Sequence, residues 1–357
     1  MAQPGVQLDP KKLDAFIGQA VCDIGAAMSA ALVVIGDKLG LYRALKEHGP
    51  LTSSELAKRT STHERYVREW LANQAAGGYL TYDPVSHKYT LPPEQAFMLA
   101  DEGSPLFVLG LFDIIQAVQA DEPKMREAFR SGKGFGWHEH DERLFAGTER
   151  FFRPGYNAHL IGEWIPSLEG VEAKLKRGAS VADVGCGLGA STIIMAQAYP
   201  QSRFLGFDYH DKSIALAKER ARDAGVEDRV EFAVASAKDF PARDYDFVAC
   251  FDCIHDMGDP VGVVRHIGKT MAADGTFMMV EPFADDTLEN NFNPVGRLFF
   301  AASTMLCTPA SLSQEVGLGL GAQCGEARMR QVVEEAGLGR FRRAAQTPFN
   351  LIYEIRK

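Results

Sequence analysis

A glycine-rich segment, residues 181–192, constrains the fold of this chain more than any other feature. It reads Val-Ala-Asp-Val-Gly-Cys-Gly-Leu-Gly-Ala-Ser-Thr. The apolar run that ends in Asp183 is typical of a buried parallel strand, and the apolar residues after Gly189 are typical of a helix. Glycines at such a junction allow a sharp turn, and they let a ligand lie against the main chain because no Cβ intervenes. A plain strand–turn–helix corner without a ligand is the alternative.

The residues that follow predict an alternating α/β domain. Helical stretches such as Lys212–Ala224 and Val261–Met271 separate short apolar runs, a pattern typical of a parallel sheet with helices on both faces. Ligands bind such sheets beyond the carboxyl ends of the strands. The second run ends in Asp208, about 20 positions after the glycines, where a ribose-binding carboxylate is expected. We expect strands at 179–184, 203–208, 229–234, 245–251 and 275–281.

The segment Asp183-Val-Gly-Cys-Gly-x-Gly, taken with Asp208, resembles the first two motifs of class I S-adenosylmethionine (SAM) methyltransferases. A dinucleotide-binding Rossmann domain would show Gly-x-Gly-x-x-Gly to receive a pyrophosphate. An acid at position 183 would repel a pyrophosphate, whereas it suits a ligand with an ammonium and a sulfonium group. The resemblance therefore implies SAM as the cofactor.

The same resemblance implies a set of cofactor contacts at four strand ends and upstream of the first strand. Relatives close over the methionine end of SAM with a residue at the place of Tyr156. They usually place an acid after the third strand, where this chain has Ala235-Ser-Ala-Lys, so Ser236 would contact the adenine and Asp239 is the fallback. The cofactor-binding residues that we expect are Tyr156, Asp183, Gly185, Gly187, Asp208, Tyr209, Ser236, Ala237 and Phe251.

Residues 1–100 predict three helical segments followed by a two-stranded wing. Apolar residues recur at helical spacing from Met28 to Leu45, and Gly49-Pro50 ends that run. Thr52-Ser-Ser-Glu is a helix-capping pattern, and a third helix is expected from His63 to Ala76. Residues 79–91 then alternate around an Asp-Pro turn, as paired strands do. The result is a winged helix-turn-helix.

A winged helix raises the hypothesis of a DNA-binding regulator, which the charges disfavour. Residues 1–100 hold six Lys and four Arg against five Asp and five Glu, a net charge of zero. In the third helix, Arg65 and Arg68 are offset by Glu64 and Glu69, so few cations remain for phosphates. The module resembles instead the N-terminal domain of small-molecule O-methyltransferases, where it serves dimerisation and closes the acceptor pocket. That resemblance implies a homodimer with Leu32, Ile35 and Leu39 partly buried between two copies.

The fold class that we expect is α/β: a Rossmann-like class I methyltransferase sheet with a terminal antiparallel hairpin, preceded by a mostly α winged-helix domain. The boundaries are 1–100 for the winged helix, 101–170 for a helical connector and lid, and 171–357 for the SAM-binding domain. Residues 284–325 interrupt the alternation as an apolar, aromatic cap. Phe341–Thr347 and Phe349–Arg356 are the expected terminal hairpin.

The chemistry is expected after the fourth strand, in Phe251-Asp-Cys-Ile-His-Asp-Met. This segment looks like the His-Asp-Trp-x-Asp segment of O-methyltransferases, in which the histidine is the general base. His255 is then the base, and Glu281, at the end of the fifth strand, orients it. A helix-capping histidine, with catalysis by positioning alone, is the alternative, and His138 and His140 are the next candidates for the base.

Composition limits the function classes. A formal charge of −9 argues against a general attraction to nucleic acid or anionic membranes. No run of about 18 to 20 uncharged apolar residues is present, so no transmembrane helix is expected. The six cysteines are scattered through mostly apolar runs, which indicates reduced thiols in a cytoplasmic protein. Cys250-x-x-Cys253 has no second pair to complete a zinc site, and His138-x-His140 shows no further ligand, so no metal is expected.

The sequence thus predicts SAM-dependent methyl transfer to a small, aromatic or otherwise apolar acceptor, with O-methylation favoured. N-, S- or C-methylation on the same scaffold is the enzymatic alternative. A SAM-binding winged-helix transcriptional regulator is the non-enzymatic one.

Overall fold

The computed structural model describes residues 8–357, which form two compact units. The first unit runs to Gln116 and takes in Phe145–Pro154, and the second consists of Ala117–Leu144 and Gly155–Lys357. The chain passes between the units within α6 (Leu109–Ala120) and within α8 (Arg143–His159). Residues 101–170 are therefore divided between the two units.

The first unit contains the winged helix that the sequence predicts. Its elements are α1 (Pro10–Lys38), α2 (Leu41–His48), α3 (Ser53–Thr60), α4 (Glu64–Ala76), β1 (Thr81–Asp83), β2 (Lys88–Thr90) and α5 (Pro93–Leu99). The capping pattern at Thr52 is realised as a capping box with Glu55. The two strands pair antiparallel, with Tyr82 opposite Tyr89.

The expectation of one continuous helical run from Met28 to Leu45 is wrong. The chain breaks between α1 and α2 because Gly40 has a φ of +70°, a backbone conformation that an α-helix does not contain. The apolar spacing continues across the break because both helices bury residues in the same core, among them Val33 and Leu41. Periodicity alone therefore does not locate the break.

The long helix α1 is anchored at its C-terminal end, where it packs closely against α4. The Trp70 indole donates a hydrogen bond to the Leu32 carbonyl at 2.8 Å. A Cβ on Gly36 would lie 2.4 Å from the Trp70 ring, so only glycine permits this approach. Much of the remaining helix exposes apolar side chains, namely Leu13, Phe16, Ile17, Val21, Ile24, Met28 and Ile35.

Among the described residues, α1 is the one helix that is long and apolar enough to cross a membrane by length and composition. The expectation that no such helix exists is thus not met by this criterion. A single helix of this kind near the N-terminus is weak evidence for a membrane span, because signal sequences and buried core helices pass the same test.

The second unit is built on a seven-stranded sheet of order β5-β4-β3-β6-β7-β9-β8. Only β9 runs antiparallel to its neighbours, which confirms the predicted terminal hairpin. All five expected parallel strands are present within a few residues of their predicted bounds. The strands are β3 (Ser180–Val184), β4 (Arg203–Asp208), β5 (Val230–Val234), β6 (Tyr245–Phe251), β7 (Met271–Pro282), β8 (Arg340–Gln346) and β9 (Asn350–Arg356).

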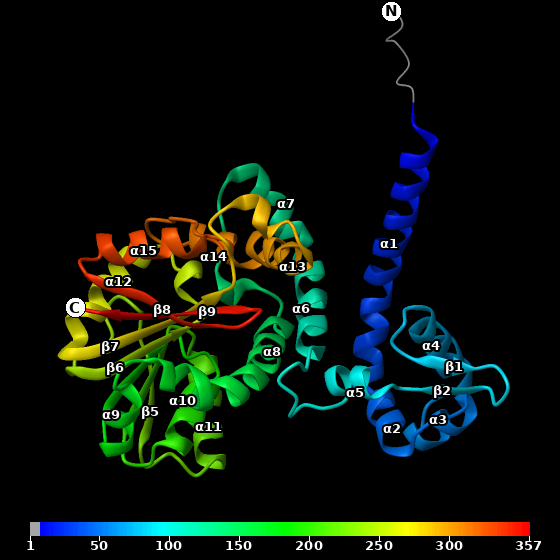
Figure 1. Ribbon diagram of the computed structural model, residues 1–357, viewed down its shortest axis with the longest axis horizontal. Helices are drawn as coiled ribbons and strands as arrows, with labels where there is room; N and C mark the ends of the chain where they lie inside the picture. Colours follow the sequence, from blue (N-terminus) through cyan, green and yellow to red (C-terminus); the bar gives the residue numbers. More distant parts are fainter. Residues whose placement is uncertain (1–7) are drawn as a thin grey trace, which may run out of the picture. The chain divides into compact units, whose positions relative to one another are not determined.

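Helices cover both faces of this sheet (Figure 1). On one face lie α9 (Val171–Arg177), α10 (Ala190–Ala198) and α11 (Asp211–Asp223). On the other lie α12 (Pro260–Thr270) and α15 (Gly325–Glu335), whose Val264 and Val332 are fully buried in the main core. Two-sided coverage explains why the central strands are mostly apolar.

The insertion between β7 and α15 folds as a helical cap. It comprises η5 (Leu288–Asn291), α13 (Pro294–Ala302), the π-helix η6 (Ser303–Cys307) and α14 (Thr308–Leu312). The cap is bound to the segment after β6: the Gly258 N–H donates to Gln314 Oε1 at 3.0 Å, and the Ser311 hydroxyl donates to the Met257 carbonyl at 2.9 Å. The insertion therefore covers the carboxyl end of β6.

Candidate functional site

The glycine turn after β3 has one open position between two closely packed ones. Gly185, Gly187 and Gly189 all have positive φ angles, of 78°, 51° and 81°. A Cβ on Gly185 would lie 2.8 Å from Cys253 Sγ, and one on Gly189 would lie 2.6 Å from the Phe232 ring. Around Gly187 nothing lies within 4 Å of that point. The main chain at Gly187 is therefore accessible to a ligand.

Asp183 joins the end of β3 to the first turn of α10. Its Oδ2 accepts hydrogen bonds from the hydroxyls of Ser191 and Thr192, both at 2.6 Å. Burial raises the pKa of this carboxyl to about 6, and the charge of Asp208 acts in the same direction. Oδ1 is also buried and has no hydrogen-bond partner among the described residues. One oxygen therefore holds the helix, and the other still lacks a donor.

Asp208 ends β4 beside the open glycine. Its carboxylate accepts the Gly187 N–H at 3.0 Å and the His210 N–H at 2.9 Å, and burial raises its pKa. The next residue, Tyr209, is half exposed, with its ring 5.9 Å from that of His138. The expected ribose-binding acid thus lies next to the glycine turn, fixed by two backbone donors.

The strand end after β5 is the least organised of the four expected cofactor-binding strand ends. Ser236 is exposed, and its hydroxyl accepts the Lys238 N–H at 3.2 Å. Ala237 is half-buried against the main core, and Asp239 is exposed. Both Ser236 and Asp239 are therefore exposed at this strand end.

Tyr156 and Phe251 flank a half-buried acid, Asp252, that the sequence did not predict. Their ring centroids lie 5.2 Å apart, and the Tyr156 hydroxyl donates to Asp252 Oδ2 at 3.2 Å. Asn350 donates to the other oxygen at 2.9 Å. Burial raises the pKa of Asp252 to about 8, with a further contribution from the charge of Glu281. Asp252 also has a φ of +50°, a conformation that is uncommon outside glycine and typical of constrained sites.

The predicted couple of His255 and Glu281 is brought together at the ends of β6 and β7. His255 Nδ1 lies 2.5 Å from Glu281 Oε2, and both side chains are buried. The other oxygen of Glu281 accepts the Ile254 N–H at 3.0 Å. Burial by itself lowers the pKa of His255, but the carboxylates of Asp256 and Glu281 outweigh it and raise this pKa well above its ordinary value.

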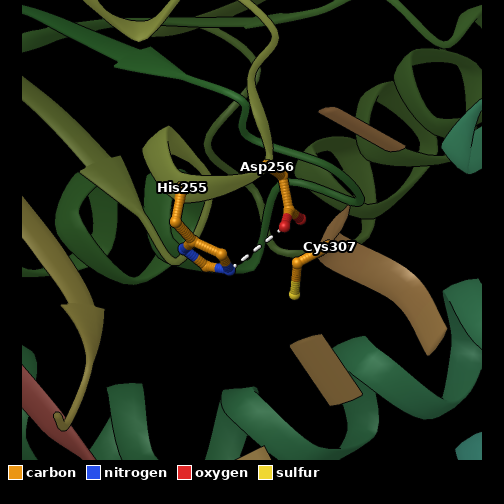
Figure 2. Close-up of side chains that lie close together, drawn as sticks. All are labelled: His255, Asp256 and Cys307. Atoms are coloured by element: carbon orange, nitrogen blue, oxygen red, sulfur yellow. Dashed lines mark ion pairs between the residues drawn. The ribbon is translucent and has the colours of Figure 1, made fainter. Parts of the chain in front are cut away.

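On its other side, His255 faces Asp256 and Cys307 (Figure 2). Nε2 lies 3.1 Å from Asp256 Oδ1, a buried oxygen that has no partner in hydrogen-bond geometry among the described residues. Cys307 comes from η6 of the cap, and its thiol pKa is raised to about 12 by burial first and by Asp256 second. One ligand atom from each of the three residues lies within 4.8 Å of the others, so this group has the spacing for a metal ion, which the sequence did not predict. The chain distance between Asp256 and Cys307 hides the group from sequence analysis.

The two remaining candidate histidines lie on a loop between α7 (Glu122–Ser131) and α8. His138 packs edge-on against Tyr209, as given above. His140 is fully buried, with Nδ1 2.8 Å from Asp121 Oδ2. The two histidines therefore face different partners.

Two family models match the chain. Residues 27–101 match an Rv2258c-like winged HTH domain, and residues 175–337 match a methyltransferase domain. The predicted winged helix and the predicted methyltransferase domain are thus both confirmed.

Known proteins agree with this assignment. The chain is 28% identical over 172 residues to 27-O-demethylrifamycin SV methyltransferase of Amycolatopsis mediterranei, covering 46% of this chain and 55% of that protein. It is 34% identical over 132 residues to ubiquinone biosynthesis O-methyltransferase of Leptothrix cholodnii, covering 36% of this chain and 53% of that protein. The match thus spans about half of each relative. Human N-acetylserotonin methyltransferase in complex with SAM superimposes with a TM-score of 0.69 at 16% identity, covering 99% of each chain, which shows a shared fold.

Proposed function

Because residues 175–337 are a methyltransferase domain, we propose that this protein transfers a methyl group from SAM to the oxygen of a small, largely apolar acceptor. One observation carries the proposal. The strand ends of a single sheet edge hold both an open glycine turn beside Asp208 and a buried His255–Glu281 couple. The first suits a nucleoside and the second a proton transfer, as methylation of a hydroxyl requires.

The residues at the glycine turn fit SAM. Asp208 would accept the ribose hydroxyls, and the main chain at Gly187 leaves room for the nucleoside. The unpartnered oxygen of Asp183 suits a cationic ligand, and the half-buried Asp252 would ionise beside such a ligand because a positive charge lowers the pKa of a carboxyl. When bound, SAM supplies an electrophilic methyl group on a sulfonium. Tyr209, Phe251 and Tyr156 would complete the contacts, with Ser236 or Ala237 near the adenine.

His255 would take the proton that the acceptor hydroxyl loses. Glu281 occupies Nδ1, so Nε2 is the atom that can receive a proton, with the acceptor hydroxyl taking the place of Asp256. A raised pKa makes His255 a stronger base, but it must be deprotonated before it can act. Turnover should therefore increase as the pH rises through the pKa of His255.

Positioning alone is the alternative mechanism, and it would suit N-, S- or C-methylation. No proton acceptor is then required, and His255 would only shape the pocket. A comparison of turnover with phenols, thiols and amines distinguishes the two mechanisms, because methylation of a hydroxyl is the reaction that most needs a base.

A SAM-binding transcriptional regulator is the second candidate function, and the contacts of α4 disfavour it. Arg65 pairs with Glu69 at 2.6 Å, and Arg68 pairs with Glu64 at 2.7 Å, so both arginines are already neutralised on the helix. A regulator would have to bind DNA with a strong dependence on salt. We expect none.

We further propose that the protein is a homodimer joined through the winged-helix unit. Ile35 and Leu39 are 45% and 49% exposed, and the apolar residues of α1 continue this exposed surface. Apolar surface of this extent is a common mark of an interface. The six cysteines are all free thiols, which supports a cytoplasmic location.

The decisive experiment is to incubate the protein with methyl-labelled SAM and separate panels of phenols, thiols and amines, and to measure S-adenosylhomocysteine. We expect turnover with phenols, unaffected by a metal chelator. Calorimetry with SAM and NAD is the parallel measurement. Failure to bind SAM, or preferential binding of NAD, would overturn the proposal.

A further inference from the structure

The second unit contains another buried histidine–carboxylate couple that the mechanism above does not use. His140 Nδ1 lies 2.8 Å from Asp121 Oδ2, with the two side chains 0% and 4% exposed. Asp121 also accepts hydrogen bonds from the Lys124 ammonium, at 2.8 Å, and from the Asp141 N–H, at 3.0 Å. These donors hold Asp121 as a carboxylate, so Nδ1 of His140 is the donor in the couple.

The other ring nitrogen of His140 has no hydrogen-bond partner in the described part of the chain. Nε2 is buried and makes no hydrogen bond with any described residue. Burial is the main cause that lowers the pKa of His140. A neutral ring whose Nδ1 carries the hydrogen presents a lone pair at Nε2. A buried acceptor without a donor is costly, and its usual explanation is a water or a ligand.

The loop that carries His140 is packed against the cap beside the proposed reaction centre. A Cβ on Gly134 would lie 1.8 Å from the Pro309 carbonyl oxygen, so the loop touches α14 directly. Pro309 follows Cys307 by two residues, and Cys307 faces His255 and Asp256 (Figure 2). The charge of Asp256 also acts on His140.

Two aromatic rings of the same loop lie beside His140. The rings of Phe135 and Trp137 lie 4.6 and 5.9 Å from that of His140. A flat, apolar molecule with a polar edge would match these two rings and the lone pair of Nε2.

We infer that His140, held by Asp121, accepts a hydrogen bond from a second hydroxyl or N–H group of the methyl acceptor. The inference rests on the proposed function and narrows its substrate class. The acceptor is an aromatic molecule with two donor groups, one methylated at His255 and one bound at His140. His140 is thus a specificity-determining residue, and Asp121 positions it.

The test is a binding experiment on the full-length protein saturated with S-adenosylhomocysteine. Calorimetric titrations with catechol, resorcinol and hydroquinone are compared with phenol, which has one hydroxyl. The variants are His140→Phe, which removes the lone pair, and His140→Gln, whose amide oxygen can accept a hydrogen bond. His138→Phe on the same loop is the matched control.

In the parent protein we expect at least one diphenol to bind roughly 3- to 10-fold more tightly than phenol, the factor of one hydrogen bond. His140→Phe should abolish this preference and leave the affinity for phenol unchanged. His140→Gln should restore part of it, and His138→Phe should keep it.

The inference is overturned if no diphenol binds better than phenol, or if His140→Phe weakens phenol and diphenols equally. Thermal melting and the affinity for SAM, measured on each variant, separate these outcomes from misfolding. A parent protein that fails to bind SAM would overturn the proposed function instead.

Discussion

Replacement of Glu281 by glutamine tests the His255–Glu281 couple most directly. The amide keeps the volume and can still accept the Ile254 N–H that Glu281 Oε1 now receives at 3.0 Å. It removes the charge opposite His255 Nδ1, 2.5 Å away in a pair that is 3 to 4% exposed. A hydrogen bond to a charged partner contributes about 1.5–3 kcal/mol, so we expect a loss of that size in the free energy of unfolding at about pH 6.

The loss in the free energy of unfolding must become smaller as the pH rises. The folded pKa of His255 is raised by the carboxylates, so the stability that it contributes is complete below its ordinary pKa and disappears as the pH rises through the folded value. Urea denaturation of the parent and Glu281→Gln, from about pH 6 to 10, should show a difference that shrinks with pH. The variant should also begin turnover at lower pH and reach a lower maximum.

Glu334→Gln on α15, at an exposed position, is the matched control and should change neither profile. A destabilisation of equal size at every pH would refute the reasoning. It would mean that Glu281 stabilises the fold by packing alone and does not set the protonation of His255.

Three further predictions follow from the site and the first unit. Asp208→Ala should weaken SAM binding by about 1.5–3 kcal/mol in calorimetry, the range for a charged hydrogen bond, and an unchanged affinity would remove Asp208 from the cofactor site. His255→Ala should lower turnover by about 10²–10⁴-fold with SAM affinity unchanged, whereas near-full activity would point to positioning alone. Sedimentation should show a dimer for the parent and a monomer for Ile35→Glu combined with Leu39→Glu; a monomeric parent would contradict the proposed interface, since both side chains are exposed in the single chain.

The arrangement of strands and the location of the cofactor region could be predicted from the sequence because their signals are local. Apolar runs, the glycines at 185, 187 and 189, and the acid at 208 each depend on a few neighbouring residues. The parallel order then brings the strand ends to one edge, so His255 and Glu281 could be expected to meet. The break at Gly40 was not predictable in this way, since the buried face continues on both sides of it.

Long-range packing decided which groups surround the His255–Glu281 couple. Cys307 reaches His255 only because the cap folds back over β6, and Asp252 meets Asn350 across 98 positions of the chain. In the sequence, His140 was noted only as a fallback base and as one half of the His138-x-His140 pair. Its partner Asp121, its burial and its unpartnered Nε2 come from the docking of one loop against α7 and α14. Local residue patterns determine strands and turns, whereas the protonation and partners of buried groups depend on which distant segments exclude water around them.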